Sequence, residues 1–379
     1  KADELQAKDG RYIRPIMVIR VERTGKDQRD GQNIHALDAK EYLIERLSVK
    51  EDEIRIKSSE LDELGISCIW TAEAYGYDAV TPLSYFAALT KNIKLGSGIM
   101  QIPGRTPAMT AMTAATIDKL SGGRFRLGVG VSGPQVVEGW HGVAYGKPLK
   151  KTREYVQILR DILNREGKTS FEGEYYNLPY NGEDASGLGK PLKLIEEPLR
   201  KNIPIYLAAI GPKNIELTAE IADGWLPFMY SPTLGDKFFN QFLDKGFEKS
   251  GNPNKKETFN ISAPVFAKLC DESERDAYLA PARNNYTLYV GGMGAKDKNF
   301  YFNLMCEYGY EDLAEKIQEL YLQGEKTEAE TLFPSELLDD LTLVGSKERI
   351  KEKLEDWKSC NVTELSISIP LDIETIKFI

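Results

Sequence analysis

From residue 66 onward, short apolar runs alternate with longer stretches in which apolar residues recur at helical spacing. The short runs, such as SCIWTAE at 67–73 and FRLGVGV at 125–131, predict buried strands, and the longer stretches predict amphipathic helices. The predicted strands occupy 67–73, 94–100, 125–131, 203–210, 224–229, 258–270 and 363–370. The predicted helices occupy 81–92, 106–120, 150–163, 214–223, 233–251 and 346–359, and three more helical segments lie between 270 and 340. Uniformly apolar strands that alternate with helices indicate a parallel sheet covered by helices.

A further strand is predicted at 14–21 (RPIMVIRV), which gives about eight strand–helix units. This number favours a closed (β/α)8 TIM barrel of the α/β class over an open doubly wound sheet. Two segments depart from the regular pattern. Residues 22–50 are an atypical polar insertion that precedes a predicted helix at 45–65, and residues 166–200 have the composition of a lid, or of a packing or dimer loop. We expect residues 1–379 to form a single domain with these two insertions.

Composition and charge exclude several classes of function. The chain has 379 residues, a net charge of -9 and no block of Lys or Arg, which disfavours a nucleic-acid partner. Four cysteines lie far apart and form no CxxC pair, which indicates reduced thiols in the cytoplasm, or in an organelle lumen after removal of a leader. Only two histidines are present, and no cluster has metal-ligand spacing, so we expect no metal site. The longest apolar runs are much shorter than the ~20 residues that span a membrane.

Two segments share one pattern of a strand, a Gly-Pro pair and the start of a helix: GVSGPQVVE at 130–138 and AAIGPKNIE at 208–216. The carboxyl ends of barrel strands carry the active site, and the N–H groups at a helix start bind anions such as phosphate. On this interpretation, the glycines between 128 and 133 allow a ligand to approach the strand end closely. The alternative is that each Gly-Pro pair only makes a tight turn.

Several stretches, in their order and spacing, resemble the luciferase-like monooxygenase superfamily of flavin-dependent barrels. More narrowly, they resemble its branch that depends on the deazaflavin coenzyme F420. The matching stretches are WTAEAYGYDAVTPL (70–83), the whole of 96–142, GKPLKKTREYV (146–156), GLGKPLK (187–193), the whole of 203–227, and LVGSKERIKEKL (343–354). The resemblance implies a TIM barrel, usually a homodimer, with F420, or alternatively FMN, in its mouth. It also implies an oxidoreductase that transfers a hydride between this cofactor and a small organic substrate, such as an alcohol, an aldehyde or an unsaturated carbonyl.

The resemblance further implies which residues bind the cofactor. Family members commonly have a bulge with a non-prolyl cis peptide against the ring, and the matching position here is Gly98-Ile99. The cofactor phosphate lies on the turns after the fourth and fifth strands. The implied cofactor-binding residues are Gly98, Ile99, Gln101, Ser132, Gly133, Gln135, Gly211, Pro212, Lys213 and Asn214. Lys213 adds a positive charge at its turn, or is simply a solvated lysine at a helix start.

Hydride transfer also needs a group near the ring that donates or accepts a proton. Glu73 is the first candidate, because it ends the strand IWTAE at the rim, where a carboxylate is partly desolvated. Its alternative role is an ion pair with Arg105 or with a lysine. His141, beside Trp140, is the second candidate, although a lone histidine next to a tryptophan can also be a structural, hydrogen-bonded residue.

The N-terminal region departs from the family pattern. Family members usually begin with a short strand that ends in a small, aromatic-rich turn near the ring, whereas IMVIRVER ends in charged residues and an extra segment follows. A second hypothesis therefore stays open. In it, the chain is a non-enzymatic structural or interaction subunit that keeps the barrel fold, and the insertion is its docking element.

Overall fold

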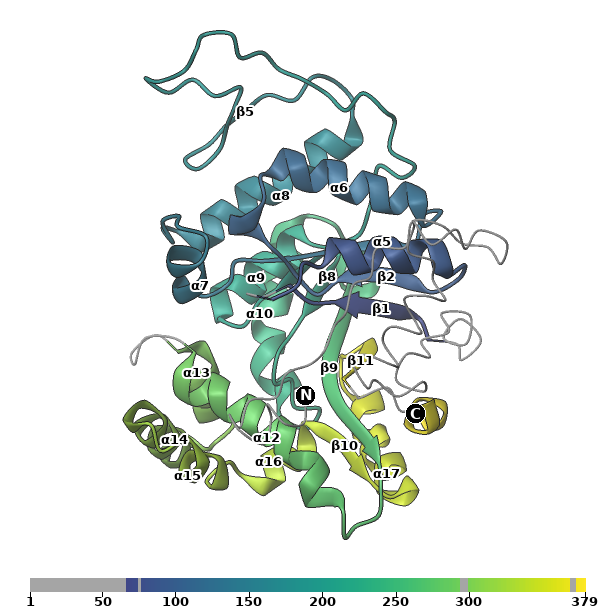
Figure 1. Ribbon diagram of the computed structural model, residues 1–379, viewed down its shortest axis with the longest axis vertical. Coiled ribbons are helices and arrows are strands. Elements are labelled where there is room, and N and C mark those ends of the chain that lie inside the picture. The colour runs from purple at the N-terminus through teal and green to yellow at the C-terminus, as the bar shows by residue number, and fades with distance from the viewer. Residues whose placement is uncertain (1–65, 74–75, 294–298, 369–372) are drawn as a thin grey trace, which may run out of the picture.

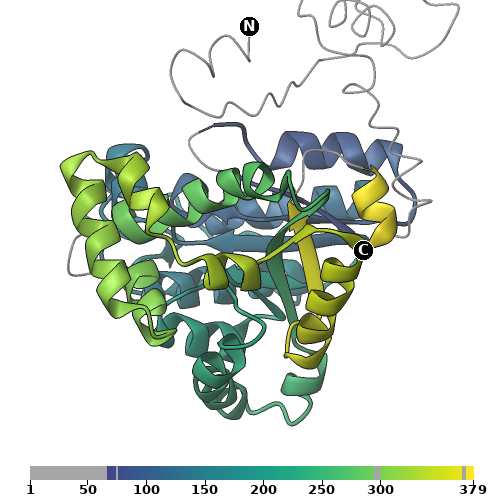
Figure 2. The same ribbon diagram turned by 90° about the horizontal axis from the view of Figure 1, so that it is seen from below.

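The computed structural model describes residues 66–73, 76–293, 299–368 and 373–379 (Figure 1). The predicted strand at 14–21, the insertion at 22–50 and the predicted helix at 45–65 lie outside the described residues. In the described part, the strands lie at the centre and the helices surround them (Figures 1 and 2).

The strands form one main sheet, which curves into a nearly closed barrel and confirms the predicted fold class. Its order is β1-β2-β4-β7-β8-β9-β10, while β11 also pairs with β9 and β3 pairs with β4. Every pair in it is parallel, as the uniformly apolar strands predicted. The strands are β1 (Cys68–Thr71), β2 (Lys94–Ser97), β3 (Met100–Gln101), β4 (Phe125–Gly130), β7 (Ile205–Ala208), β8 (Gly224–Leu226), β9 (Asn260–Leu269), β10 (Thr342–Gly345) and β11 (Glu364–Ser368).

The helices pack around this sheet and bury two apolar cores between themselves and the strands. One core joins β1, β2, β4 and β7 to the first helices, and the other joins β8, β9 and β10 to the later ones. The helices are α5 (Val80–Leu89), η1 (Ile102–Gly104), α6 (Pro107–Leu120), α7 (Pro134–Gly139), α8 (Pro148–Asn164), α9 (Pro212–Ile221), α10 (Gly235–Ser250), α11 (Lys255–Thr258), α12 (Arg275–Gly292), α13 (Phe300–Glu307), α14 (Glu311–Gln323), α15 (Lys326–Thr331), α16 (Ser335–Asp340), α17 (Lys347–Ser359) and α18 (Ile373–Phe378).

The region from 270 to 345 differs from the prediction. It contains the five helices α12 to α16 where three were expected, because two of them, α15 and α16, have only six residues each. The strand β10 was not predicted, since its four residues TLVG are too few to reveal a period.

Residues 166–200 lie along helix α8 on the side away from the barrel (Figure 1). They contain a small antiparallel hairpin of β5 (Phe171–Glu172) and β6 (Asn177–Leu178). The buried carboxylate of Glu154 on α8 accepts hydrogen bonds from the backbone N–H groups of Glu174, Tyr175 and Tyr176, at 2.9, 2.9 and 3.3 Å. The guanidinium of Arg165 donates to the carbonyls of Leu194 and Ile195. Glu154 on α8 and Arg165 directly after α8 thus hold residues 166–200 in place. The role of this segment as a lid stays a prediction.

Side chains alternate along the strands between the helices and the barrel interior. On β4, Leu127 and Val129 belong to the core under the helices, so Arg126 faces the interior. Its guanidinium forms an ion pair with Glu364 of β11 at 2.6 Å and lies 5.6 Å from the centre of the Tyr206 ring. The amino-terminal end of the barrel is therefore packed with side chains, as in other small barrels.

A bulge interrupts the pairing between β4 and its neighbour. Strand β2 pairs with β4 up to Gly96–Arg126, and β3 resumes at Met100–Val129, so the β2–β3 side uses one residue more than β4. The Ser97 hydroxyl bridges the gap, because it donates to the Gly128 carbonyl at 2.8 Å and accepts from the Gly128 N–H at 2.9 Å. The peptide bond between Gly98 and Ile99 in this bulge is cis, at the position that the resemblance implies.

The bulge explains two of the glycines on β4. A Cβ atom on Gly128 would lie 1.8 Å from the Ser97 carbonyl oxygen, and one on Gly130 would lie 2.8 Å from the end of the Ile99 side chain. The neighbouring strand alone is therefore enough to require glycine at Gly128, and the interpretation that the glycines here make room for a ligand stays a prediction.

We expect Gly128→Ala to lower the free energy of unfolding by at least about 2 kcal/mol, because the clashing atom is backbone and cannot rotate away. Urea unfolding followed by circular dichroism measures the change. Gly139→Ala is the matched control, since a Cβ there meets no atom within 4 Å. Equal stability of the two variants would contradict the packing described for the bulge.

Candidate functional site

The carboxyl ends of β3, β4 and β7 lie side by side. Gln101 at the end of β3 pairs with Gly130 of β4, and Val129 of β4 pairs with Leu207 of β7. The loops that follow β4 and β7 therefore leave the barrel at one edge. These loops contain the Gly-Pro pairs that the sequence singled out.

The two Gly-Pro turns have the same local structure. Gly133 and Gly211 are the N-caps of α7 and α9, and each is followed by a proline at the first helical position. The carbonyl of each glycine accepts the N–H groups of the third and fourth residues after it. Glycine brings no side-chain acceptor to the first turn and proline has no N–H, so the N–H of the second helical residue, Gln135 in α7 and Lys213 in α9, is the one left open to an anion at each turn. Ser132 before the first turn has a φ of 59°, which places it in the left-handed region.

The second turn carries features that the sequence did not reveal. A Cβ atom on Gly211 would lie 2.8 Å from the ring of Phe300, so this aromatic side chain covers the turn. The ammonium of Lys213 is exposed and pairs with Glu216 on the same helix at 2.9 Å. Lys249 and Lys213 lower the pKa of the Glu216 carboxyl to about 2. Lys213 is therefore a paired, exposed lysine at a helix start, and its contact with a cofactor stays a prediction.

Glu73 lies at the same edge, just beyond β1. Its carboxylate is 10% exposed and forms an ion pair with the guanidinium of Arg105. The second carboxylate oxygen accepts the Ala79 N–H at 3.3 Å. The alternative role that the sequence left open for Glu73, an ion pair with Arg105, is thus present in the structure. A catalytic role for Glu73 stays a prediction.

Arg105 is itself held in place through its backbone. The Tyr155 hydroxyl donates to the Arg105 carbonyl at 3.2 Å and contacts the Thr110 hydroxyl at 2.5 Å. Burial raises the pKa of Tyr155 to about 12, so its hydroxyl stays protonated at neutral pH and remains a donor.

His141 is linked to Glu73 through Gln101. The Nε2 atom of His141 lies 2.5 Å from Oε1 of Gln101, and Nε2 of Gln101 donates to the Glu73 carbonyl at 3.2 Å. Trp140, next to His141, is 66% exposed. The structure therefore brings together both predicted catalytic residues and one predicted cofactor-binding residue, Gln101, whose side chain is buried between them.

An aromatic group follows β8 at the carboxyl edge, and the sequence analysis did not identify it. The ring of Phe228 lies 4.3 Å from that of Tyr289 and 5.4 Å from that of Tyr301. These residues are far apart in sequence and come from the loop after β8 and from α12 and α13. Only the fold brings them together, so no local pattern could have predicted the group.

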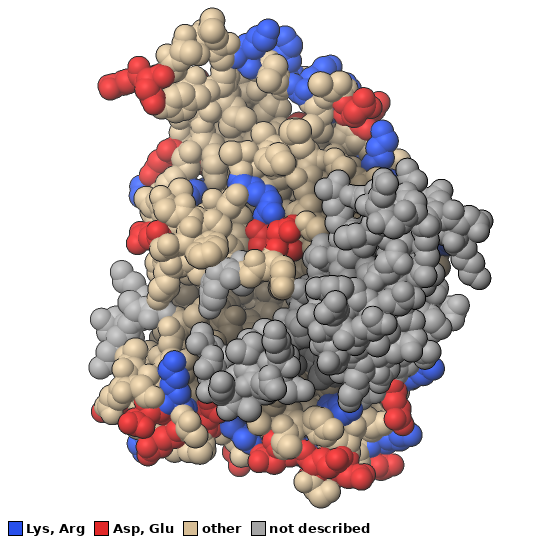
Figure 3. Space-filling view, viewed as in Figure 1, with Lys and Arg blue, Asp and Glu red and all other residues tan. Residues whose placement is uncertain are grey.

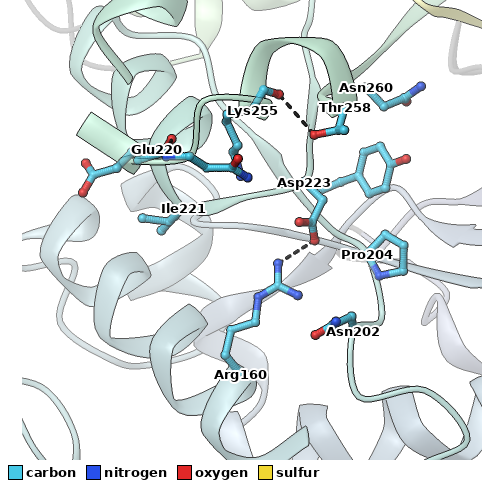
Figure 4. A pocket seen from close by; sticks show the side chains of 12 residues that line it. Arg160, Asn202, Pro204, Glu220, Ile221, Asp223, Lys255, Thr258 and Asn260 are labelled. Carbon is cyan, nitrogen blue, oxygen red and sulfur yellow. Dashed lines mark hydrogen bonds and ion pairs between the residues drawn. The ribbon is translucent and has the colours of Figure 1, made fainter. Parts of the chain in front are cut away.

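A cavity of about 590 Å³ lies at the other end of the barrel. Its lining includes Pro204 before β7, Asp223 before β8 and Asn260 at the start of β9, together with side chains of α8, α9 and α11. Its main charged pair is Arg160–Asp223 at 2.5 Å, and Lys255 belongs to the same wall (Figure 4). Because active sites of such barrels lie at the carboxyl ends of the strands, we assign this cavity no part in the chemistry.

Other kinds of site find little support in the described residues. All four cysteines are free, and burial raises their pKa values, to about 12 for Cys68 and about 11 for Cys306. Across the described ranges, no group of three or more His, Cys, Asp or Glu side chains could hold a metal ion. The same ranges include no helix that is both long and apolar enough to cross a membrane. On the face drawn in Figure 3, the described basic and acidic side chains are interspersed.

The chain is similar to known proteins over most of its length. The sequence profile of the luciferase-like monooxygenases matches residues 52–364. A putative coenzyme F420-dependent oxidoreductase of Mycobacterium tuberculosis is 42% identical to this chain over 307 residues, which cover 81% of this chain and 88% of the relative.

Two solved structures have the same fold. One is the coenzyme F420-dependent tetrahydromethanopterin reductase of Methanopyrus kandleri, with a TM-score of 0.69, 22% identity, and coverage of 86% of this chain and 92% of that one. The other is an F420-dependent secondary alcohol dehydrogenase in complex with an F420-acetone adduct, with a TM-score of 0.66, 15% identity, and coverage of 85% and 90%.

We expect Gly133→Leu to abolish binding of F420 and FMN without unfolding the protein. The φ of Gly133 is -82°, which any residue adopts, and a Cβ there meets only the end of the Gln135 side chain at 3.1 Å. A leucine side chain would occupy the space where an anion approaches the turn. Absorbance titration with each cofactor measures binding, and Gly139→Leu on the far end of α7 is the control. Unchanged cofactor affinity in Gly133→Leu would count against an anion at this turn.

Proposed function

Because the chain belongs to the luciferase-like monooxygenase family, we propose that it is a coenzyme F420-dependent oxidoreductase. In this proposal, it transfers a hydride between F420 and a small organic substrate. The relative that is 42% identical bears the same description, which supports F420 as the cofactor over FMN.

One observation carries the proposal. Two Gly-Pro turns follow the adjacent strands β4 and β7 at the carboxyl edge of the barrel, and His141, the candidate for proton exchange, is hydrogen-bonded to Gln101 at the end of the neighbouring strand β3. The two turns suit an anionic cofactor, and His141 suits the proton transfer that accompanies hydride transfer to or from a carbon that bears oxygen.

The described residues suit a phosphate-bearing cofactor. Ser132 and the main-chain N–H groups of Gln135 and Lys213, at the starts of α7 and α9, would hold the phosphate. The bulge at Gly98-Ile99 would lie against the ring, and Gly211, Pro212 and Asn214 would form the second side of the phosphate site. When bound, F420 supplies or accepts the hydride, and the protein orients the substrate and moves the proton.

The proton requirement favours His141 over Glu73 as the group that exchanges it. Oxidation of an alcohol removes a hydride from carbon and leaves a proton on oxygen, and this proton needs a base about 3 Å away. Both carboxylate oxygens of Glu73 already have partners within the protein, the guanidinium of Arg105 and the N–H of Ala79, so the carboxylate is less available to a substrate hydroxyl than the His141 ring. Alcohol–ketone pairs are therefore the first substrate class to test, followed by aldehydes and unsaturated carbonyls.

We further propose that the protein is a homodimer and that it works in the cytoplasm. Four free cysteines suit a reducing compartment. Helix α6 exposes a largely apolar row at helical spacing, made of Met109, Met112, Thr116 and Leu120, with the exposed Lys119 at its end. The neighbouring helix α5 exposes Tyr85 and Leu89. A second copy could cover this largely apolar face, because the same row on each copy can pack across a two-fold axis.

The function is tested by titrating the purified protein with F420 and with FMN in separate experiments. Tight binding of F420 and weak binding of FMN, followed by reduction of bound F420 on addition of a secondary alcohol such as 2-propanol, is the expected result. Tight binding of FMN alone would replace F420 in the proposal. Binding of neither would favour the non-enzymatic hypothesis over the proposal.

The dimer is tested by light scattering. We expect the wild type to have twice the chain mass of 42.6 kDa and Met112→Asp to be monomeric, because a charge in the middle of an apolar interface is desolvated without a partner. Leu322→Asp, at an exposed apolar position on α14, is the control and should stay dimeric. A monomeric wild type would refute the role given to this face.

A further inference from the structure

The side-chain amide of Gln101 lies between two groups with different hydrogen-bonding needs. On one side is the main-chain carbonyl of Glu73, 3.2 Å from the amide nitrogen. On the other side is Nε2 of His141, 2.5 Å from the amide oxygen. Gln101 is 4% exposed, so water does not compete for either contact.

These neighbours determine which way the amide points. A main-chain carbonyl can only accept a hydrogen bond, so the atom of Gln101 that faces Glu73 must be the NH₂ group. The amide oxygen then faces His141, and because an amide oxygen only accepts, Nε2 of His141 must carry a proton. The reverse orientation would place two acceptors against each other at Glu73.

We propose that Gln101 is a positioning residue that holds His141 with a proton on Nε2 and leaves Nδ1 as the nitrogen that exchanges a proton with the substrate. Among the described residues, no hydrogen-bond partner of Nδ1 is found. The first half of this proposal concerns the free protein, and the second half rests on the proposed function.

Contacts on the other sides hold the unit together. The His141 ring packs against Gly104, where an added Cβ would lie 3.0 Å from Cε1 of the ring. The His141 N–H donates to the Val136 carbonyl at 3.1 Å. Gln101 is kept in place by its ladder partner Gly130 on β4. Each member of the unit is therefore tied to the barrel by its backbone as well as by its side chain.

The proton balance of this arrangement is simple. When a substrate alcohol is oxidised, the hydrogen of its C–H bond leaves with the bonding electron pair as hydride, which F420 would accept, the C=O bond forms, and the hydroxyl proton passes to Nδ1. The imidazolium that results still donates from Nε2 to Gln101. In the direction of reduction, Nδ1 returns the proton to the oxygen of the substrate.

The first experiment needs neither cofactor nor substrate. The chain has only two histidines, so His35→Gln leaves His141 as the single histidine in a ¹⁵N-histidine NMR spectrum. At a pH at which the ring is neutral, we expect a directly bonded proton on Nε2 that exchanges slowly with water, and none on Nδ1. A proton on Nδ1 would overturn the proposal without any further variant.

Two substitutions in this background test the part played by Gln101. Gln101→Leu removes the acceptor, and the Nε2 proton should then exchange rapidly or the ring should become a mixture of the two neutral forms. Gln101→Glu keeps an acceptor toward His141 but loses the NH₂ group that faces the Glu73 carbonyl, so slow exchange at Nε2 should return although the contact with Glu73 does not. Gln157→Leu changes an exposed glutamine on α8 and should leave the spectrum unchanged. Spectra of Gln101→Leu identical to those of the parent would also overturn the proposal.

A second measurement separates positioning from cofactor contact. If Gln101 acts through His141, the F420 affinity of Gln101→Leu equals that of the parent, while turnover with a secondary alcohol falls by about 100-fold. A loss of F420 affinity of about tenfold or more would mean that Gln101 contacts the cofactor itself. If the parent binds no F420, the proposed function fails, and the NMR result still decides the state of His141.

Discussion

The close approach of the β2–β3 bulge to β4 is the constraint on which the candidate site depends. The Ser97 carbonyl reaches the position that a Cβ atom would take on Gly128, and the Ser97 hydroxyl replaces the hydrogen bonds that the bulge interrupts. One extra residue in the bulge sets where β3 resumes, and therefore where Gln101 stands beside Gly130. From that position Gln101 reaches both Glu73 and His141. The geometry of the contacts among Glu73, Gln101 and His141 thus depends on the packing of two strands.

The rim around this group is largely neutralised by internal pairs. Glu73 is paired with Arg105, and Lys213 is paired with Glu216. Of these residues, His141 has no charged partner among the described residues. The hydrogen bond of its ring is with the neutral side-chain amide of Gln101. The His141 ring therefore takes no part in the ion pairs of the rim, which fits the role in proton exchange that is proposed for it.

Periodicity and spacing predicted most of the barrel but less of the site. Apolar runs located β4, β7 and β9, because strands buried on both faces have a strong local signal. The Gly-Pro turns were also predicted, since glycine and proline mark turns directly. The sequence could not reveal that Phe300 covers Gly211, or that Phe228 meets Tyr289, because these contacts join distant parts of the chain. The sequence also could not show that the Ser97 carbonyl approaches Gly128, since a pattern of small residues does not say which neighbour comes close.

Residues 166–200 are held at two points, and the chain between these points can change in length without affecting the barrel. The Glu154 carboxylate holds the hairpin at one point, and Arg165 holds the returning chain at another. Between the two anchors the chain is outside the barrel, and doubling the length of such a loop costs only about 0.6 kcal/mol in closure entropy. Insertions can therefore accumulate there over evolution, or be engineered there, while the register of β4 and β7 stays as it is.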